Sequence, residues 1–171
     1  MSPPFPKRSR HVYIGAALLL AAAAAQALDG QNFGSWTSKC EDGHDKNEGS
    51  CYIFQNRALR EGGQRVLRIV VGYVATTPEP IALLSLPLGI SLPPGVSLSI
   101  DGGEATRIPV ERCEPNGCNA GLKIEQKLLK QIIAGKQMTV TFYDAKRQPI
   151  AVPLALEGFE QGLQALKKPA K

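Results

Sequence analysis

The chain has 171 residues, of which 43% are hydrophobic and 20% are charged. This length suits one globular domain, and the apolar content is too high for an intrinsically disordered chain. The 20 Lys and Arg residues against 15 Asp and Glu residues give a formal charge of +5, so the position of the positive charge decides whether an acidic partner is expected.

The N-terminal segment, residues 1–27, has the pattern of a cleaved Sec signal peptide. Basic residues precede an apolar run over 14–25, and Ala25-Gln26-Ala27 supplies the small residues of a cleavage site. The run is about 12 residues long, whereas a membrane-spanning helix needs about 20, which disfavours an uncleaved membrane anchor. The first cysteine is Cys40, too late for a lipid anchor. We therefore predict no stable membrane insertion after cleavage.

Cleavage would also change the charge argument. Lys7, Arg8 and Arg10 leave with the leader, so the mature chain keeps 17 basic and 15 acidic residues, a formal charge of +2. Three of the remaining lysines lie in a basic tail, residues 167–171. A nucleic-acid-binding protein concentrates positive charge on one face. The sequence therefore predicts no nucleic-acid partner.

All four cysteines, Cys40, Cys51, Cys113 and Cys118, lie in the predicted mature chain. An even number in an exported protein indicates disulfide bonds, because the periplasm and the extracellular space are oxidising. Four cysteines allow three pairings. Spacing favours Cys40–Cys51 and Cys113–Cys118, the second pair across the turn sequence Glu-Pro-Asn-Gly. Zinc knuckles and redox-active C-x-x-C motifs have shorter gaps, so we expect neither.

Short apolar runs bounded by turn residues predict strands through most of the mature chain. The clearest is 65–75, where Leu67, Ile69 and Val71 share one face, after a hairpin turn at Glu61-Gly62-Gly63. Proline cannot donate to a sheet ladder, so the proline-rich segment 87–95 is expected to be an edge, bulge or turn. We expect further strands over the ranges 33–39, 51–59, 81–86, 96–101 and 106–112.

At residues 122–134 the apolar pattern changes to a spacing of three and four, which predicts an amphipathic helix with Gly135 as its C-cap. Lysines lie on its opposite face and could contact a membrane. Helices of this kind usually bury the apolar stripe in their own domain, so we expect packing rather than membrane binding.

A hairpin of strands 137–143 and 149–156 follows, and then a short C-terminal helix with Phe159, Leu163 and Leu166 on one face. Many short strands with one helix before the last hairpin are typical of mainly β folds. The sequence predicts one β-sandwich or partly open barrel domain over 28–166.

Few residues could carry chemistry. His44 is the only histidine of the predicted mature chain and lies in a polar loop, where we expect a solvated side chain rather than a catalytic base. The acidic stretch from Asp42 to Glu48 lacks the ligand spacing of an EF-hand. Asp101 and Glu104 flank an Asp-Gly-Gly turn, for which backbone geometry is a sufficient reason. We predict no catalytic residue, no metal and no cofactor.

Four segments together resemble the invasion-associated locus B family of exported Gram-negative proteins, and they span about residues 36–163. They are Trp36 ahead of Cys40 with Cys51-Tyr52-Ile53-Phe54-Gln55; Pro87-Leu88-Gly89-Ile90-Ser91-Leu92-Pro93-Pro94-Gly95-Val96 through Ile100-Asp101; Cys113 with Gly117-Cys118-Asn119-Ala120; and Leu154-Ala155-Leu156-Glu157-Gly158-Phe159 with Gly162-Leu163. The resemblance implies an exported, mainly β protein, linked in some members to host-cell invasion. It carries no catalytic residues with it.

We therefore expect a non-enzymatic envelope protein that acts through contacts with a protein partner or with an envelope or host surface component. Its expected place is the periplasm, the outer surface or the medium of a Gram-negative bacterium. One alternative is a periplasmic enzyme with a carboxylate-based site, for which a cleft with perturbed acids would argue. Another is a periplasmic chaperone or assembly factor that uses an open strand edge.

Overall fold

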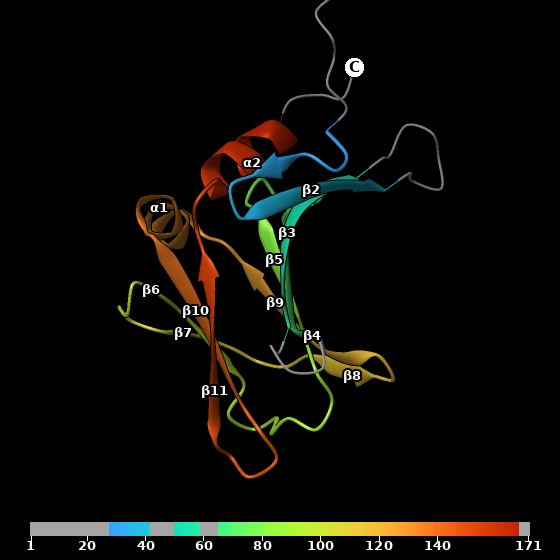
Figure 1. Cartoon of the computed structure of the whole chain (residues 1–171), viewed down its shortest axis with the longest axis vertical. Coiled ribbons are helices and arrows are strands. Elements are labelled where there is room, and N and C mark those ends of the chain that lie inside the picture. The colour runs from blue at the N-terminus through green and yellow to red at the C-terminus, as the bar shows by residue number, and fades with distance from the viewer. Residues whose placement is uncertain (1–27, 42–49, 59–64, 168–171) are drawn as a thin grey trace, which may run out of the picture.

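The computed structural model describes residues 28–41, 50–58 and 65–167, which form two antiparallel sheets and two helices (Figure 1). The seven-stranded sheet has the order β1 (Asn32–Phe33), β2 (Trp36–Glu41), β3 (Ser50–Ala58), β4 (Arg65–Gly72), β5 (Ile81–Leu86), β9 (Gly117–Lys123) and β8 (Arg112–Glu114). The four-stranded sheet has the order β11 (Pro149–Ala155), β10 (Gln137–Tyr143), β6 (Val96–Ile100) and β7 (Thr106–Ile108). The helices are α1 (Gln126–Ala134) and α2 (Phe159–Leu166). The predicted fold class, a mainly β sandwich-like domain with these two helices, is confirmed.

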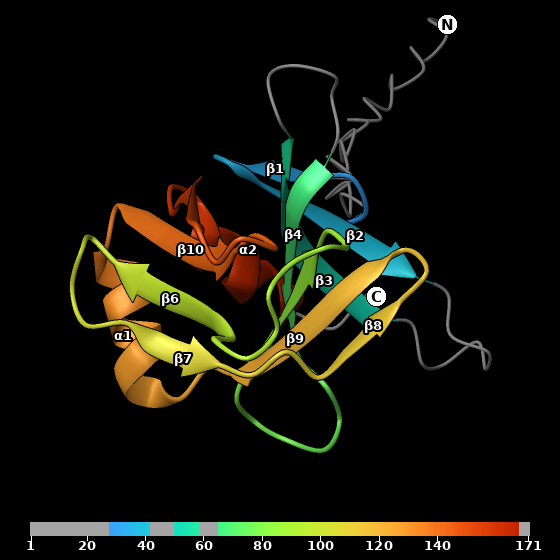
Figure 2. The same cartoon turned by 90° about the horizontal axis from the view of Figure 1, so that it is seen from below.

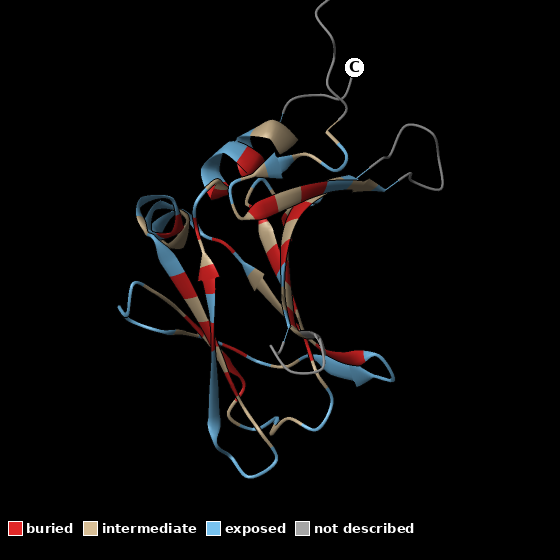
Figure 3. Ribbon diagram, in the orientation of Figure 1, coloured by how far each residue is buried: buried red, intermediate tan, exposed pale blue. Residues whose placement is uncertain are grey.

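The core lies between the sheets, because side chains alternate between the two faces of each strand. In β4, Leu67, Ile69 and Val71 are fully buried, while Arg68 and Val70 point away from them and are half-buried. From the other sheet, Val140 of β10 and neighbouring apolar side chains fill the same core. Figure 3 shows these buried positions as red segments along the strands of both sheets.

Side chains of β2 and β3 attach the large sheet to the edge strand β11. The Trp36 indole N–H donates to the carbonyl oxygen of Ala155 at 3.1 Å, and the Gln55 amide donates to the same oxygen at 2.6 Å. Farther along the edge, Arg57 Nε donates to the carbonyl oxygen of Pro153 at 3.0 Å. The carbonyl groups of Pro153 and Ala155 on this edge strand are thereby satisfied within the molecule.

Helix α2 closes one end of the sandwich. Phe159 at its start packs edge-on against Trp36, with 5.1 Å between the ring centroids. Phe159 and Leu163 are buried and Leu166 is half-buried, so the three apolar residues do face the core. Within the described part of the chain, no helix is long and apolar enough to cross a membrane.

The predicted strand 106–112 is in fact two strands in different sheets. Pro109 follows β7, and because it has no N–H the ladder with β6 cannot continue through it. The chain crosses to the other sheet and pairs with β9 as β8 (Figure 2). This crossing is one of the connections that join the two layers.

The helix predicted at 122–134 begins only at Gln126. Residues 117–123 instead form β9, a strand absent from the sequence-based expectation, which pairs with β5 from Leu86↔Cys118 to Ile81↔Lys123. Ladder pairing with β5 outweighs the local helical spacing. Ile124, counted as part of the helical stripe, is buried in the connection between β9 and α1.

The remaining sequence-based expectations either agree with the structure or concern residues outside the described ranges. Strands β3 and β4 pair as an antiparallel hairpin, but the turn at Glu61-Gly62-Gly63 lies outside the described residues. The predicted leader 1–27 and the tail residues 168–171 also lie outside them. Segment 87–95 makes only one isolated bridge, Ile90↔Asp144, as its prolines require.

Candidate interaction surface

The outward side of the large sheet carries a cross-strand row of apolar side chains. Phe54 of β3 lies opposite Val70 of β4, Val70 lies opposite Leu83 of β5, and Leu83 lies opposite Gly121 of β9. Leu83 is 52% exposed. Outward positions of a sandwich are usually polar, so a continuous apolar row in the middle of a sheet is a candidate contact surface.

Arg68 lies beside this row and is held by two aromatic rings. Its guanidinium carbon is 4.8 Å from the Phe54 ring centroid and 5.9 Å from that of Tyr52. Arg68 Nη2 also donates to the Tyr52 hydroxyl oxygen at 3.3 Å. Cation–π contact and the hydrogen bond fix a positive charge at the centre of the sheet. We call Tyr52, Phe54, Arg68, Val70 and Leu83 the outer face.

Acidic side chains frame the outer face. The Tyr52 hydroxyl donates to Glu41 Oε1 at 2.6 Å. On the opposite side, the Glu111 carboxylate lies over Gly121, where a Cβ would stand 2.7 Å from Glu111 Oε1. The outer face therefore combines an apolar row, a central guanidinium and an acidic rim, the mixture found where proteins recognise other proteins.

The pKa of Tyr52 is raised above its ordinary value of 10.0. Partial burial is the largest cause, and the hydrogen bond and negative charge of Glu41 add to it, while Arg68 opposes them. The phenol is therefore neutral at physiological pH and remains a hydrogen-bond donor.

The two disulfides join directly paired residues of adjacent strands. Cys40 of β2 pairs with Cys51 of β3 with a Cα–Cα distance of 4.0 Å, and Cys113 of β8 pairs with Cys118 of β9 at 3.9 Å. This is the pairing that the spacing favours. Cys40–Cys51 lies next to the pair Lys39↔Tyr52, so it braces the β2–β3 end of the outer face.

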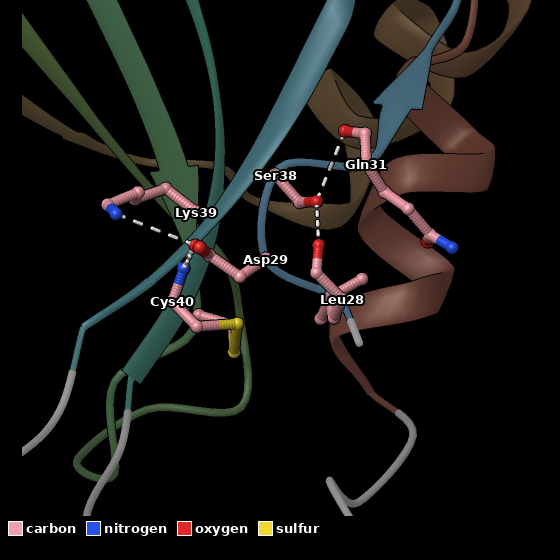
Figure 4. The surroundings of a disulfide bond; sticks show 7 residues. Leu28, Asp29, Gln31, Ser38, Lys39 and Cys40 are labelled. Atoms are coloured by element: carbon pink, nitrogen blue, oxygen red, sulfur yellow. Dashed lines mark hydrogen bonds and ion pairs between the residues drawn. A yellow bond between two sulfur atoms is a disulfide. The ribbon is translucent and has the colours of Figure 1, made fainter. Parts of the chain in front are cut away.

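The first described residues wrap around the Cys40 strand (Figure 4). The Asp29 carboxylate accepts a hydrogen bond from the Cys40 backbone N–H at 2.8 Å and lies 3.7 Å from Lys39 Nζ. The hydroxyl of buried Ser38 contacts the carbonyl oxygen of Leu28. The chain is thus integrated into the fold from Leu28, directly after the predicted cleavage site.

The structure gives the other candidate residues little chemistry. His44 and the stretch from Asp42 to Glu48 lie outside the described residues. The Asp101 carboxylate accepts hydrogen bonds from the backbone N–H groups of Lys136 and Gln137 at 3.0 and 2.9 Å. It therefore stabilises the connection between α1 and β10. Glu104 is exposed beyond the turn. Across 28–41, 50–58 and 65–167, no group of three His, Cys, Asp or Glu side chains could hold a metal ion.

Two open grooves lie beside α1. One, of about 200 Å³, is lined by Asp101, Glu104 and Gln131 among others, and the second, of about 440 Å³, extends past Glu104 to Lys123 and Leu128. No histidine, cysteine or serine is among their lining residues. Neither groove therefore holds a Ser–His or Cys–His pair of nucleophile and base.

The sequence pattern placed Leu67, Ile69 and Val71 on one face of their strand but did not reveal the outer face as a unit. A usable signal was present: Tyr52-Ile53-Phe54, Val70-Val71 and Ala82-Leu83-Leu84 are apolar on both faces of their strands. Strict alternation is the pattern of an antiparallel strand with one solvated face. What the sequence could not supply was the register that aligns these runs.

Comparison with known proteins gives a consistent result. Residues 36–167 match the family model described as invasion associated locus B (IalB) protein. The chain is 30% identical over 142 residues to the invasion protein B homologues of two Brucella abortus strains, covering 81% of this chain and 80% of theirs. The crystal structure of invasion associated protein B from Bartonella henselae superposes with a TM-score of 0.67 at 21% identity, covering 80% of this chain and 92% of that one.

Proposed function

Because the chain belongs to the invasion associated locus B family, we propose that it is an exported, non-enzymatic envelope protein that contributes to host-cell invasion through protein contacts. The observation that carries the contact mechanism is the outer face. Phe54, Val70 and Leu83 form an apolar row on the outward side of the sheet, where Leu83 is 52% exposed, and Arg68 supplies a fixed charge beside it.

Export is supported by three features. The leader pattern of residues 1–27 is followed at once by Leu28 and Asp29, which are bound to β2. Both cysteine pairs are joined as disulfides, which persist in oxidising compartments. The relatives are named as invasion proteins.

Of the two alternatives, a carboxylate-based enzyme has the weaker structural support. The Asp101 carboxylate already accepts hydrogen bonds from backbone N–H groups, and the groove that Glu104 lines is open and is also lined by exposed lysines. A catalytic acid needs an environment that holds it at the reacting bond.

A chaperone that captures strands at the β11 edge is also disfavoured. Pro149 and Pro153 have no N–H to donate along that edge. The carbonyl oxygens of Pro153 and Ala155 already accept hydrogen bonds from Arg57, Trp36 and Gln55. Prolines and internal capping are ways in which proteins prevent addition of a further strand.

The export part of the proposal is tested by protease treatment of intact cells and of osmotically opened cells. We expect the protein to be digested in at least one of the two samples, while a cytoplasmic marker stays protected in both. Digestion on intact cells would mark a surface protein with direct access to the host. Digestion only after opening would mark a periplasmic protein whose effect on invasion is indirect. Protection in both samples contradicts export.

The contact part is tested by photo-crosslinking in living cells. A photoreactive amino acid at Leu83, 52% exposed on the outer face, is expected to give a discrete crosslinked product. The matched control places it at Ile133, 40% exposed on α1. Arg68→Glu should remove the Leu83 product and lower invasion in a complemented deletion strain. Equal products from both positions, or an Arg68→Glu strain that invades normally, contradict the proposal.

A further inference from the structure

Three exposed apolar side chains belong to two neighbouring segments at the end of the sandwich opposite α2. Leu88 and Leu92, in the segment between β5 and β6, are 54% and 47% exposed, and Ile150, near the start of β11, is 37% exposed. The segment and the β10–β11 hairpin lie side by side at the lower end of the molecule in Figure 1. We call Leu88, Leu92 and Ile150 the leucine end.

Backbone contacts join the two parts of the leucine end. The Ser91 N–H donates to the carbonyl oxygen of Tyr143 at 2.8 Å, and Ile90 forms a bridge with Asp144. Ile150 pairs with Phe142 in the same hairpin. In Figure 3 this end of the hairpin is coloured as exposed.

Leu88 and Leu92 belong to a segment whose backbone is restrained. Pro87, Pro93 and Pro94 restrict the backbone, and the half-buried Ile90 packs against the core between the two leucines. Arg107 of β7 donates from Nε to the carbonyl oxygen of Pro94 at 2.9 Å and from Nη2 to that of Pro93 at 2.6 Å. Leu88 and Leu92 are thus held toward solvent by a loop that loses little entropy on binding.

Positive charge surrounds these apolar side chains. Lys146 and Arg147 form the hairpin tip, and the Arg107 guanidinium lies at the carbonyl groups of Pro93 and Pro94, next to Leu92 in the chain. The Asp144 carboxylate is engaged by the backbone N–H groups of Lys146 and Gln148, both at 2.8 Å. The salt bridges among the described residues are Lys39–Asp29 and Arg112–Glu114, so none neutralises these three cations.

We propose that the leucine end binds the surface of an anionic phospholipid bilayer. Leu88, Leu92 and Ile150 would enter the headgroup–acyl boundary, where apolar side chains leave water. Lys146, Arg147 and Arg107 would lie at the level of the lipid phosphates, which attract basic residues near the surface. A bilayer surface combines an apolar layer with an anionic one, and this end of the molecule exposes both apolar and basic side chains.

This peripheral contact differs from insertion and goes beyond the proposed function. The outer face runs along the side of the sandwich, so it would remain accessible on a molecule bound by its leucine end. A protein partner at the leucine end is the competing occupant.

The test is vesicle flotation with protein purified from the producing cell's envelope, its N-terminus checked by mass spectrometry. One vesicle set mixes phosphatidylglycerol with phosphatidylcholine, and the other is phosphatidylcholine alone. Binding to the anionic set that weakens at high salt is expected, because attraction between surface charges is screened. Leu88→Thr/Leu92→Thr should lower the apparent partition constant by about tenfold or more. Lys146→Glu/Arg147→Glu should remove the preference for phosphatidylglycerol.

Matched controls are Leu83→Thr, which changes an equally exposed leucine of the outer face, and Lys130→Glu on α1. Both should bind vesicles like the wild type. Leu92→Trp adds a readout that needs no loss of binding: its fluorescence should shift to shorter wavelength with anionic vesicles. No wild-type binding, equal losses in the controls, or an unshifted emission spectrum of the Leu92→Trp variant would each overturn the proposal. So would Leu88→Thr/Leu92→Thr protein that floats with anionic vesicles as well as the wild type.

Discussion

At the scale of single residues, Tyr52 shows how neighbours adjust one side chain of the outer face. Its phenol donates to Glu41 and accepts from Arg68, and the Arg68 guanidinium lies over Phe54. Four residues from three strands therefore depend on one another. None of these contacts is visible in the sequence, where Glu41, Tyr52 and Arg68 are separated by more than ten positions each.

The raised pKa of Tyr52 makes a prediction for alkaline pH. The pKa of Tyr52 is higher in the folded protein than in the unfolded chain. The neutral phenol therefore contributes its full share to folding stability below about pH 10, and this contribution is lost as the pH rises through the pKa of the folded state. Glu41→Gln removes a negative charge that raises this pKa, so the tyrosinate absorbance of Tyr52 should appear at lower pH.

Tyr52→Phe identifies the Tyr52 contribution in this titration. Glu104→Gln, a change in an exposed acid away from the outer face, is the matched control and should leave the curve unchanged. A Glu41→Gln titration that coincides with the wild type, or that moves to higher pH, would show that Glu41 does not influence the phenol.

At the scale of elements, some connections between strands and helices need glycine, because their backbone has a positive φ. Gly158 links β11 to α2 with φ of +83°, and a Cβ there would overlap the carbonyl oxygen of Phe33. Gly89, in the segment between β5 and β6, has nearly the same φ, +81°, but a Cβ there would have no atom within 4 Å. Comparing substitutions at the two glycines therefore separates the cost of backbone strain from the cost of steric overlap.

Gly158→Ala should destabilise the fold by about 3 kcal/mol or more, because the left-handed backbone and the overlap with Phe33 both act. Gly89→Ala should cost only about 1 kcal/mol, the left-handed penalty alone. Urea unfolding measured for the two variants and the wild type checks both values. Equal losses for the two would show that crowding by β1 has no part in the Gly158 requirement.

The two disulfides differ in the length of chain that they close, with sequence separations of 11 and 5 residues. In the chain-entropy model, Cys40→Ser/Cys51→Ser should lower the free energy of unfolding by about 3 kcal/mol and Cys113→Ser/Cys118→Ser by about 2 kcal/mol. Urea unfolding of the two double variants is the measurement. A larger loss for the shorter loop would contradict the entropic account and indicate that the β8–β9 hairpin needs its crosslink for native packing.

At the scale of the whole molecule, contacts around Trp36 connect the two layers. Trp36 belongs to β2 and is fully buried; its N–H reaches Ala155 of β11 and its ring packs on Phe159 of α2. Gln55 and Arg57 extend the same connection along β11. The large sheet, the small sheet and α2 are thus expected to unfold together.

Trp36 is also the only tryptophan of the chain, so its fluorescence reports this junction. Its unfolding transition in urea should coincide with that followed by far-ultraviolet circular dichroism, as for a two-state domain. Trp36→Phe keeps the ring contact but loses the N–H bond to Ala155, and should lower the midpoint without changing the slope. Separated transitions in the wild type would show that the layers unfold independently and would contradict a single domain over 28–166.

The sequence by itself determined the local features of this protein. Short apolar runs bounded by turn residues located β5 and β10 to the residue and β11 to within one residue, and they located the start of β4 but not its end at Gly72, because each pattern depends only on neighbours along the chain. The same holds for α2, for the non-strand segment 87–95 and for the cysteine pairing favoured by short loops. Pro109 also marks a break within the predicted strand 106–112. The sheet that each half joins, however, depends on pairing partners that are distant in sequence.

Tertiary structure decided the features that need partners distant in sequence. Residues 117–123 became β9 because β5 offered a complete ladder, which shortened the helix to Gln126–Ala134. The outer face exists only because the register brings Phe54, Val70 and Leu83 into one row. The leucine end likewise needs the Ser91–Tyr143 hydrogen bond to bring two loops together. Pairing register is a long-range property set by hydrogen bonding and packing, and a period along one strand does not encode it.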